Sequence, residues 1–395
     1  MRILYTGAFR FPYFDAGAHR VLNNAKILRD LGHEVIFVAF GGKYQELDRH
    51  ENGKYYFHGF EYIISDDLNV TTFTKRVLSA IKRGVNALNL IKQIPNIDII
   101  ISYNPTVYFS QRINKFAQIN GIKHIIDLTE WYDVREFKGQ YLSPLYWLNK
   151  FNMEFYQKHY VRNFITISSF LDEYYDKSNN IILPPLVDVR DKKWTDISDI
   201  STHIPEHDGY RLIYAGTPTN KDQLKNIIDG LLQLLDNENY KIQLLILGVS
   251  QEQSSIFIER EKLEKFDKNI VFLGRVQHTD VPSYYRIADF SVMVRTHSRK
   301  CMAGFPTKVA ESLAAGCPIL YNETSDIGKY LTHLKNGIKI DGYTPAHIVE
   351  GLNIISTLSK EDLSRLREQA YRSSLEDFDY TVYRSNLQNF INNCE

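Results

Sequence analysis

The sequence of 395 residues has few cysteines, only Cys301, Cys317 and Cys394. Their number is odd and their spacing is not that of metal ligands, so they predict no metal site. A sparse set of this kind is typical of proteins in a reducing compartment. We therefore expect a cytoplasmic protein.

The chain also lacks an excess of charge of either sign and lacks long apolar runs. Lys+Arg and Asp+Glu number 47 each, so the formal net charge is zero and no global field favours nucleic acid as a partner. No stretch approaches the roughly 18 apolar residues of a transmembrane helix. Residues 1–4 lead directly into a strand, which predicts no signal peptide. This length suffices for two domains.

The first residues show a pattern typical of a doubly wound parallel sheet. A strand over residues 2–6 is followed by a loop containing Gly17 and by a helix near 18–31, where apolar residues recur at helical spacing. Gly32 ends this helix, and residues 34–38 form the next strand. The unit predicts an α/β fold. Further strands are expected at 61–64, 98–102, 122–126 and 163–167.

The second half of the chain repeats this pattern. Strands are expected at 211–216, 242–247, 269–274, 290–294 and 319–321, and glycine closes the first three. Two Rossmann-like doubly wound domains are therefore predicted. Because such sheets bind ligands at the carboxyl ends of their strands, we expect the site in a cleft between the two domains.

Two adjacent prolines, Pro184 and Pro185, precede a charged, irregular stretch. Such a pair fits neither a helix nor a central strand, so it predicts a linker. The predicted N-terminal domain covers 1–185, the linker 186–208 and the C-terminal domain 209–375. Residues 376–395 are expected to form a helix that packs back toward the N-terminal domain.

The most informative segment covers residues 303–316. It predicts a short loop that opens a helix ending at Gly316. A helix N-terminus exposes unpaired N–H groups and the positive end of the helix dipole, which suit a phosphate. Lys308 in the first turn adds a full charge, and Glu311 on the same face can accept two hydroxyl hydrogen bonds from a ribose. This arrangement suits a nucleotide diphosphate.

A purely structural interpretation of the same segment stays open. Thr307 can be only the N-cap and Glu311 only an acid favoured by the helix dipole. A capping box would place its acid at Ala310, so it does not explain Glu311. A lone motif at a helix start does not decide between the two interpretations.

With these residues in place, the chain resembles the retaining glycosyltransferases of family 4, which have the GT-B fold, over nearly its whole length. In that family a Glu-Gly-Phe segment begins eight residues before a second Glu, and a small-residue helix, Gly, Pro and a strand follow. The residues that match in register are Gly304, Phe305, Glu311, Gly316 and Pro318. Residues 32–35, 269–274 and 284–289 are also similar to segments of the family.

The chain departs from the family at two positions. Ala303 stands where the family has the first Glu, an acid that lies near the transferred sugar. Thr217 stands where an arginine commonly follows the glycine that closes a strand, and Lys221 lies close to the position of the family's lysine. The resemblance implies that Glu311 binds the ribose and that Lys221 and Lys308 bind the diphosphate.

The resemblance implies a retaining transfer of a sugar, from a UDP- or GDP-linked donor to a glycan or lipid-linked acceptor. The usual role of similar proteins is to build bacterial surface polysaccharide, such as capsule, lipopolysaccharide or exopolysaccharide. We expect no metal and no other cofactor, since lysines and helix N-termini can stabilise the leaving diphosphate. The predicted donor-side residues are Gly17, Gly216, Thr217, Lys221, Arg295, Gly304, Phe305, Pro306, Thr307, Lys308 and Glu311.

In the N-terminal domain, loops that follow strands are expected to face the acceptor. Carboxylates accept hydroxyl hydrogen bonds and aromatic faces offer flat apolar surfaces, as a sugar acceptor needs. We predict that Asp127 or Glu130 is the acceptor-side acid, and helix capping is an equally good explanation. The predicted acceptor-binding residues are Tyr103, Asn104, Trp131 and Tyr132; the predicted catalytic residues are Asp127, Glu130, Lys221 and Lys308.

A basic amphipathic segment over residues 74–92 allows peripheral contact with an anionic membrane. A helix with one packed face and one solvated basic face is the alternative. For the whole chain, two other functions stay open. One is a nucleotide-sugar 2-epimerase of the same fold, and the other is a non-catalytic relative that acts in binding or assembly.

Overall fold

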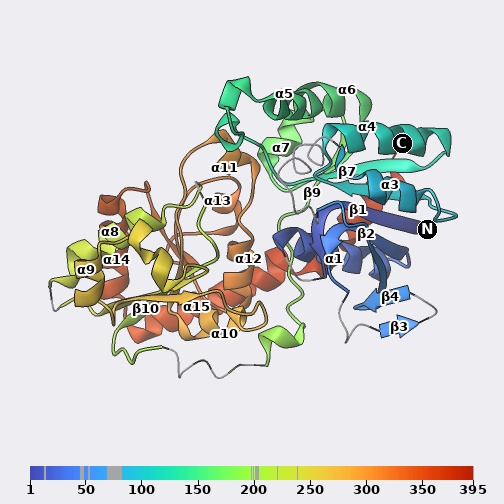
Figure 1. Cartoon of the computed structure of the whole chain (residues 1–395). Helices are drawn as coiled ribbons and strands as arrows, with labels where there is room; N and C mark the ends of the chain where they lie inside the picture. Colours follow the sequence, from blue (N-terminus) through green and yellow to red (C-terminus); the bar gives the residue numbers. More distant parts are fainter. Residues whose placement is uncertain are drawn as a thin grey trace. The chain divides into compact units, whose positions relative to one another are not determined.

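The computed structural model describes residues 1–395 except 13–14, 45–48, 52–53, 69–81, 197, 199, 201–203, 220, 238 and 395. The chain divides into two compact units, each an α/β structure built on its own largely parallel sheet (Figure 1). The first unit comprises Met1–Leu186 and Tyr380–Glu395, and the second comprises Val187–Asp379. This architecture confirms the predicted fold class.

The sheet of the first unit has the strand order β3-β4-β5-β2-β1-β6-β7-β8-β9. All neighbouring strands pair in parallel except β3 with β4 and β4 with β5. The strands are β1 Arg2–Phe11, β2 Glu34–Gly42, β3 Arg49–Glu51, β4 Lys54–Phe57, β5 Phe60–Ile64, β6 Ile99–Tyr103, β7 Lys123–Leu128, β8 Asn163–Thr166 and β9 Asn179–Ile182.

Alternation along β1 divides the core of the first unit between the two faces of the sheet. Ile3 and Tyr5 belong to one buried cluster, which also holds residues of α1 and α16, whereas Leu4 belongs to another, with residues of α3 and α4. The helical elements are α1 Ala16–Asp30, α3 Val85–Ile91, α4 Val107–Ile119, η1 Val134–Glu136, η2 Gln140–Leu142, α5 Pro144–Lys150, η3 Phe151–Gln157, α6 Lys158–Tyr160, α7 Ser169–Tyr174, η8 Tyr380–Tyr383 and α16 Arg384–Asn392.

The sheet of the second unit has the order β12-β11-β10-β13-β14-β15, and every pair is parallel. Its strands are β10 Tyr210–Ala215, β11 Ile242–Leu247, β12 Ile270–Gly274, β13 Phe290–Met293, β14 Ile319–Asn322 and β15 Gly337–Ile340. Its helical elements are η4 Lys192–Trp194, α8 Leu224–Leu235, η6 Gln251–Ile256, α9 Arg260–Lys265, α10 Val281–Ile287, α11 Arg299–Ala303, α12 Thr307–Ala314, α13 Ile327–Tyr330, α14 Pro345–Thr357, α15 Lys360–Ser373 and η7 Ser374–Phe378.

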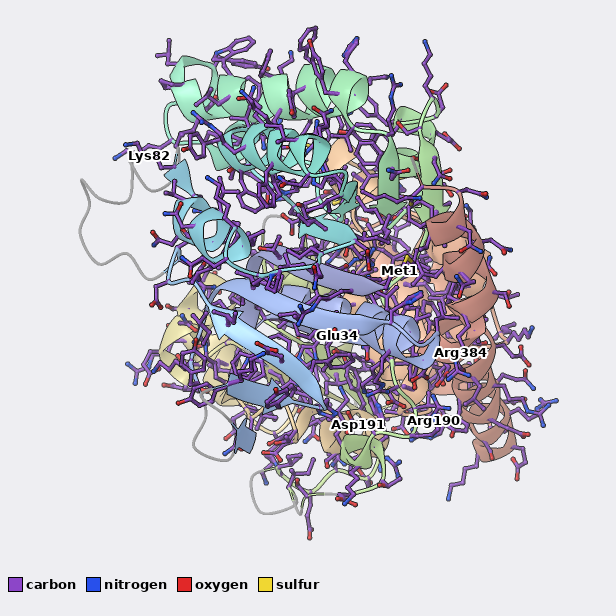
Figure 2. The ribbon with its side chains drawn as sticks, turned by 90° about the vertical axis from the view of Figure 1, so that its right-hand side faces the viewer. Met1, Glu34, Lys82, Arg190, Asp191 and Arg384 are labelled. Carbon is purple, nitrogen blue, oxygen red and sulfur yellow. The ribbon has the colours of Figure 1, made fainter. Side chains whose placement is uncertain are left out.

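The predicted basic segment over 74–92 lies partly outside the described residues. Lys82 is exposed, as Figure 2 shows, and α3 buries Ala87, Leu88 and Ile91. The structure therefore gives this segment a packed apolar side at its end, and membrane contact by it stays a prediction. Within the described part of the chain, no helix has the length and apolar character needed to cross a membrane.

Candidate active site

The loops at the carboxyl ends of the second sheet bring most of the predicted donor-side residues together. Gly216 follows β10 and Gly248 follows β11, with φ of +118° and +90°. A Cβ at Gly248 would lie 2.5 Å from the carbonyl carbon of Gly216. A Cβ at Gly216 would lie 3.0 Å from Cε of Lys308. Glycine at position 216 therefore leaves room for the lysine, and glycine at position 248 leaves room for the loop after β10.

Lys308 lies in the first turn of α12 with its ammonium group largely buried. Nζ lies 4.1 Å from the centroid of the Tyr214 ring and 3.9 Å from Oδ1 of Asp222. Burial lowers the pKa of Lys308 to about 8, opposed by the charge of Asp222 and reinforced by that of Arg295. The site thus holds a cation whose charge is only partly neutralised by its surroundings.

Asp222 was not among the predicted site residues, yet it organises the cations. Its Oδ1 lies 3.1 Å from Nε of Arg295, and Thr219 donates to its Oδ2 from both the backbone N–H and the hydroxyl, each at 3.2 Å. Burial by itself raises the pKa of Asp222, but Lys308 and Arg295 hold it below its ordinary value. Asp222 therefore stays ionised and fixes both cations.

Arg295 is fixed from a second side by the end of β14. Its N–H donates to Oδ1 of Asn322 at 2.9 Å, and its carbonyl accepts from Nδ2 of the same residue at 2.8 Å. Asn322 is fully buried. Lys221 and Thr217 lie on the loop after β10; the carbonyl of Lys221 accepts from the N–H of Thr296 at 3.3 Å, and the Thr217 side chain is exposed.

Glu311 lies one turn after Lys308 on α12. Its Oε1 lies 3.6 Å from Nε2 of His278, a residue on the loop after β12. Burial raises the pKa of Glu311, but His278, Lys193 and Lys308 together outweigh burial, so the pKa is below its ordinary value. The carboxylate is therefore ionised near neutral pH and accepts hydrogen bonds, as a ribose ligand must.

The loop before α12 is anchored in the core. The Phe305 ring is buried and packs edge-on against Tyr330, with centroids 5.5 Å apart. Pro306 is the N-cap of α12 in extended backbone conformation, so Thr307 is the first helical residue and not the cap. Gly304 and Ala303 are buried as well. Phe305 therefore positions the start of the helix from within the core.

In the first unit, Asp127 lies in a buried network. It is fully buried at the end of β7, and Nη2 of Arg20 lies 2.8 Å from its Oδ1. Tyr5 and Asn24 donate hydrogen bonds to its other oxygen. Arg20 also donates to the carbonyl of Leu183 at 2.8 Å. An acceptor hydroxyl would have to displace Arg20 to reach this carboxylate, so the geometry gives Asp127 a structural role.

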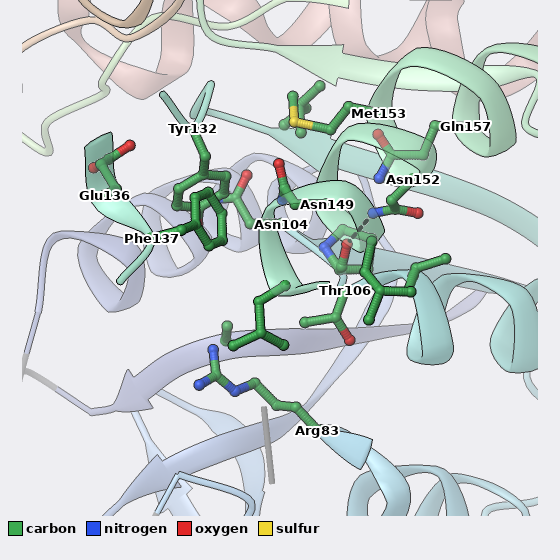
Figure 3. Close-up of a pocket in the computed structure, with 16 residues that line it drawn as sticks. Arg83, Asn104, Thr106, Tyr132, Glu136, Phe137, Asn149, Asn152, Met153 and Gln157 are labelled. Atoms are coloured by element: carbon green, nitrogen blue, oxygen red, sulfur yellow. Dashed lines mark hydrogen bonds between the residues drawn. The ribbon is translucent and has the colours of Figure 1, made fainter. Parts of the chain in front are cut away.

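The other predicted acceptor-side residues separate into two groups. Trp131 is buried against Tyr174, with ring centroids 4.9 Å apart, and Glu130 is only partly buried. Asn104 and Tyr132 line a cavity of about 440 Å³, shown in Figure 3 together with Arg83. Burial raises the pKa of Tyr132 well above its ordinary value, and the charge of Glu130 raises it further. The cavity and its neighbour Glu130 thus form the candidate acceptor side.

Gly17 and Tyr103 meet at the start of α1. A Cβ at Gly17 would lie 2.9 Å from Cε1 of the Tyr103 ring, so a larger residue would displace that ring. The hydroxyl of Thr129 donates to that of Tyr103 at 3.2 Å, and Asn104 is tied to Thr129 by two hydrogen bonds of 2.7 and 2.9 Å. Packing against Tyr103 alone accounts for the glycine at position 17.

Asp377 and Asp379 flank Phe378 and so have the Asp-x-Asp spacing of some metal sites. Asp379 lies 3.4 Å from Nη2 of Arg190 and accepts from the N–H of Val189. Its carboxylate thus joins the two ends of the second unit. Among the residues that the structure describes, no group of three or more His, Cys, Asp or Glu could hold a metal ion.

Comparison with known proteins agrees with this architecture. Residues 198–373 match the family model described as glycosyl transferases group 1. No curated protein matches the sequence.

Several solved structures match nearly the whole chain at low sequence identity. Sucrose-phosphate synthase from Thermosynechococcus elongatus has a TM-score of 0.71 at 13% identity, covering 99% of this chain and 98% of the synthase. Anabaena HepE, in complex with UDP, has a TM-score of 0.68 at 13% identity, covering 99% and 100%. WaaG, a glycosyltransferase involved in lipopolysaccharide biosynthesis, has a TM-score of 0.66 at 15% identity, covering 99% of this chain and 100% of WaaG. The chain therefore has the GT-B fold, and residues 198–373 of its second unit match glycosyl transferases group 1.

Proposed function

We propose that the chain is a retaining glycosyltransferase that moves a sugar from a nucleotide diphosphate donor to a glycan or lipid-linked acceptor, in the synthesis of bacterial surface polysaccharide. The observation that carries this proposal is the placement of Lys308. Its buried ammonium lies at the N-terminus of α12, beside Arg295 and one turn before Glu311. A positive charge for a diphosphate and a hydrogen-bond acceptor for ribose hydroxyls thus occur on one helix.

The chemistry requires that negative charge growing on the leaving diphosphate be stabilised. Lys308 and the N-terminus of α12 supply positive charge from fixed positions, so little reorganisation is needed during the reaction. Asp222 holds Lys308 and Arg295 in place before the donor binds. We assign Lys221, on the same loop as Asp222, as a further diphosphate ligand.

The transferred sugar retains its anomeric configuration if the acceptor attacks from the face that the diphosphate leaves. That route needs no enzyme nucleophile, and we assign none. On the acceptor side, Glu130 and the cavity residues Asn104 and Tyr132 supply polar groups beside an aromatic ring. HepE has been solved with UDP and glucose, which supports a UDP-sugar as the donor of this chain.

A second function is favoured by one observation, the buried Ala303 at the end of α11. The family has an acid at this position, so a chain that binds the nucleotide without transferring a sugar would be consistent with alanine there. Release of the nucleotide in the presence of acceptor, with the sugar attached to the acceptor, distinguishes transfer from binding alone. Donor turnover that needs no acceptor would instead indicate the epimerase.

The proposal is tested by thermal unfolding with UDP-, GDP- and CMP-sugars. A ligand at about 100 times its dissociation constant stabilises the folded protein by about 2.7 kcal/mol, so one nucleotide class should raise the melting temperature. Glu311→Ala should reduce this shift, whereas the matched control Glu350→Ala, an exposed acid on α14, should keep it. No shift with any nucleotide, or an equal shift in Glu311→Ala, would refute the assignment.

A further inference from the structure

One helix of the first unit carries large apolar side chains on its outer surface. The elements α5, η3 and α6 form a continuous helix over residues 144–160, and both Figure 1 and Figure 2 show it outermost, next to α4. Trp147, Phe151 and Phe155 are 50%, 43% and 46% exposed. They are spaced four residues apart, and the wider turn of the π-helical η3 keeps that spacing on one side.

Neighbouring residues extend this surface. The aromatic rings of Phe151 and Phe155 are stacked with centroids 5.2 Å apart, and Nε1 of Trp147 donates to the carbonyl of Tyr141 at 2.8 Å. We call the whole set the outer face. It comprises Tyr141, Leu142, Trp147, Phe151, Phe155 and Tyr160, all exposed. A contiguous apolar surface of this kind is typical of an interaction site.

Basic side chains accompany the outer face. Nζ of Lys150 lies 5.4 Å from the centroid of the Trp147 ring. Nζ of Lys158, on the same helix, lies 4.3 Å from the ring centroid of Tyr174 on α7. Residues 135–162 contain five Lys or Arg and two Asp or Glu, in a chain whose net charge is zero. The charge of this region therefore favours an anionic partner.

We propose that the outer face binds the headgroup region of an anionic phospholipid membrane. Trp and Tyr rings suit that region because they are apolar with a polar edge. Lysine stems that lie along aromatic rings can bury their methylenes while the ammonium reaches lipid phosphates. The cores of protein–protein interfaces are depleted of lysine, which makes a protein partner a poorer fit.

The inner side of the same helix lines the cavity of the candidate acceptor side (Figure 3). Leu145, Leu148 and Met153 supply apolar contacts there, and Asn149 and Asn152 supply amides, with Asn152 donating to the carbonyl of Pro105 at 2.8 Å. One helix thus connects the proposed membrane surface to the cavity. Resting on the proposed function, this assigns the acceptor to the lipid-linked class, with its apolar anchor in the membrane.

The test is co-sedimentation of the full chain with vesicles of phosphatidylglycerol and phosphatidylcholine, compared with phosphatidylcholine alone. We expect binding to the anionic vesicles, and at least a tenfold loss in the variant Trp147→Ser/Phe151→Ser/Phe155→Ser. The matched control Ile119→Ser/Ile256→Ser/Tyr371→Ser changes three exposed apolar residues elsewhere and should bind as the wild type does. Thermal unfolding of both variants verifies that they are folded.

Charge is tested separately. Lys138→Glu/Lys150→Glu/Lys158→Glu should lose binding, whereas reversal of three exposed lysines of the second unit, at positions 225, 262 and 265, should not. Changing Lys75, Arg76, Lys82 and Arg83 to Glu isolates any contribution of the basic segment over 74–92. If that variant alone lost binding, the outer face would not be the membrane site.

Tryptophan fluorescence gives a second readout. Trp131 and Trp194 are buried, at 7% and 3% exposed, so a blue shift caused by anionic vesicles should come from Trp147. Trp147→Phe should remove the shift and still co-sediment.

Two results would overturn the inference: vesicle binding unchanged by the triple serine variant, or a wild-type dimer that this variant converts to monomer without any vesicle binding. A nucleotide-induced rise in melting temperature, measured on the same samples, distinguishes failure of the membrane site from failure of the proposed function.

Discussion

The ammonium of Lys308 lies 3.9 Å from Oδ1 of Asp222, although the two residues come from different loops of the second sheet. This contact opposes the effect of burial, which lowers the pKa of Lys308 to about 8. The lysine is therefore charged below about pH 8 and neutral above it. A diphosphate that needs the ammonium should bind less tightly as the pH rises through that value.

Asp222→Asn should shift this dependence to lower pH. The substitution removes the charge that raises the pKa of Lys308 and leaves burial and Arg295, which lower it. We expect UDP affinity close to that of the wild type at pH 6 and several-fold weaker at pH 8, measured by calorimetric titration from pH 6 to 9. Asp229→Asn, at an exposed i,i+4 pair on α8, is the control and should leave the profile unchanged.

Lys308→Met should stabilise the protein while removing diphosphate binding. Because the lysine pKa is lowered in the folded state, its protonated form is disfavoured there, and stability rises with pH between about 8 and the ordinary value of 10.5. Methionine keeps the contact with Tyr214 without the charge. At pH 7 we expect the free energy of unfolding to rise by about 1 kcal/mol in urea titrations. A clear loss of stability would contradict the assignment of Lys308 as a buried cation that lowers the stability of the folded protein.

Arg20→Ala should destabilise the first unit strongly. It leaves Asp127 buried without its ionic partner, a change that typically costs about 3–5 kcal/mol. Urea unfolding measures the effect. Arg260→Ala removes an exposed pair with Glu264 and should leave the free energy of unfolding nearly unchanged. Equal effects of the two substitutions would mean that the buried network does not support the fold.

Glu130→Gln should slow sugar transfer without changing nucleotide affinity. If the carboxylate assists the acceptor hydroxyl, its loss should lower kcat by about 100-fold or more. Glu173→Gln, at an exposed acid on α7, is the control. An unchanged kcat would leave Glu130 without a role in the reaction.

The sequence predicted most strands but missed β3, β4, β9 and β15. β6 and β11 are mostly apolar segments, fully buried in parallel sheets and interrupted only by Ser102 and Gln243, so composition alone identifies them. β9 begins with two asparagines, and β15 has only four residues with a lysine among them. Their place in the sheet depends on neighbouring strands, which a local pattern does not contain.

The site was predictable where one segment carries it. Lys308 and Glu311 lie on one helix, α12, so their spacing alone indicated that they share a face. Asp222 was missed because its partner Arg295 is 73 residues away and follows another strand. Asp127 looked like a loop acid at a strand end, but it lies on the side of β7 that α1 covers. Arg20, 107 residues earlier, determines its environment.

The most direct test of the account measures nucleotide binding by calorimetry with UDP, UMP and uridine, or with the guanine series if GDP is preferred. Lys308→Ala should weaken the binding of UDP at least tenfold and leave the binding of uridine unchanged, because the lysine contacts only phosphate. Glu311→Ala should weaken the binding of all three ligands by a similar factor, because the carboxylate contacts the ribose. The same variant should bind 2′-deoxy-UDP as tightly as UDP. If Lys308→Ala weakened uridine as much as UDP, or if Glu311→Ala weakened none of them, the central claim would be wrong.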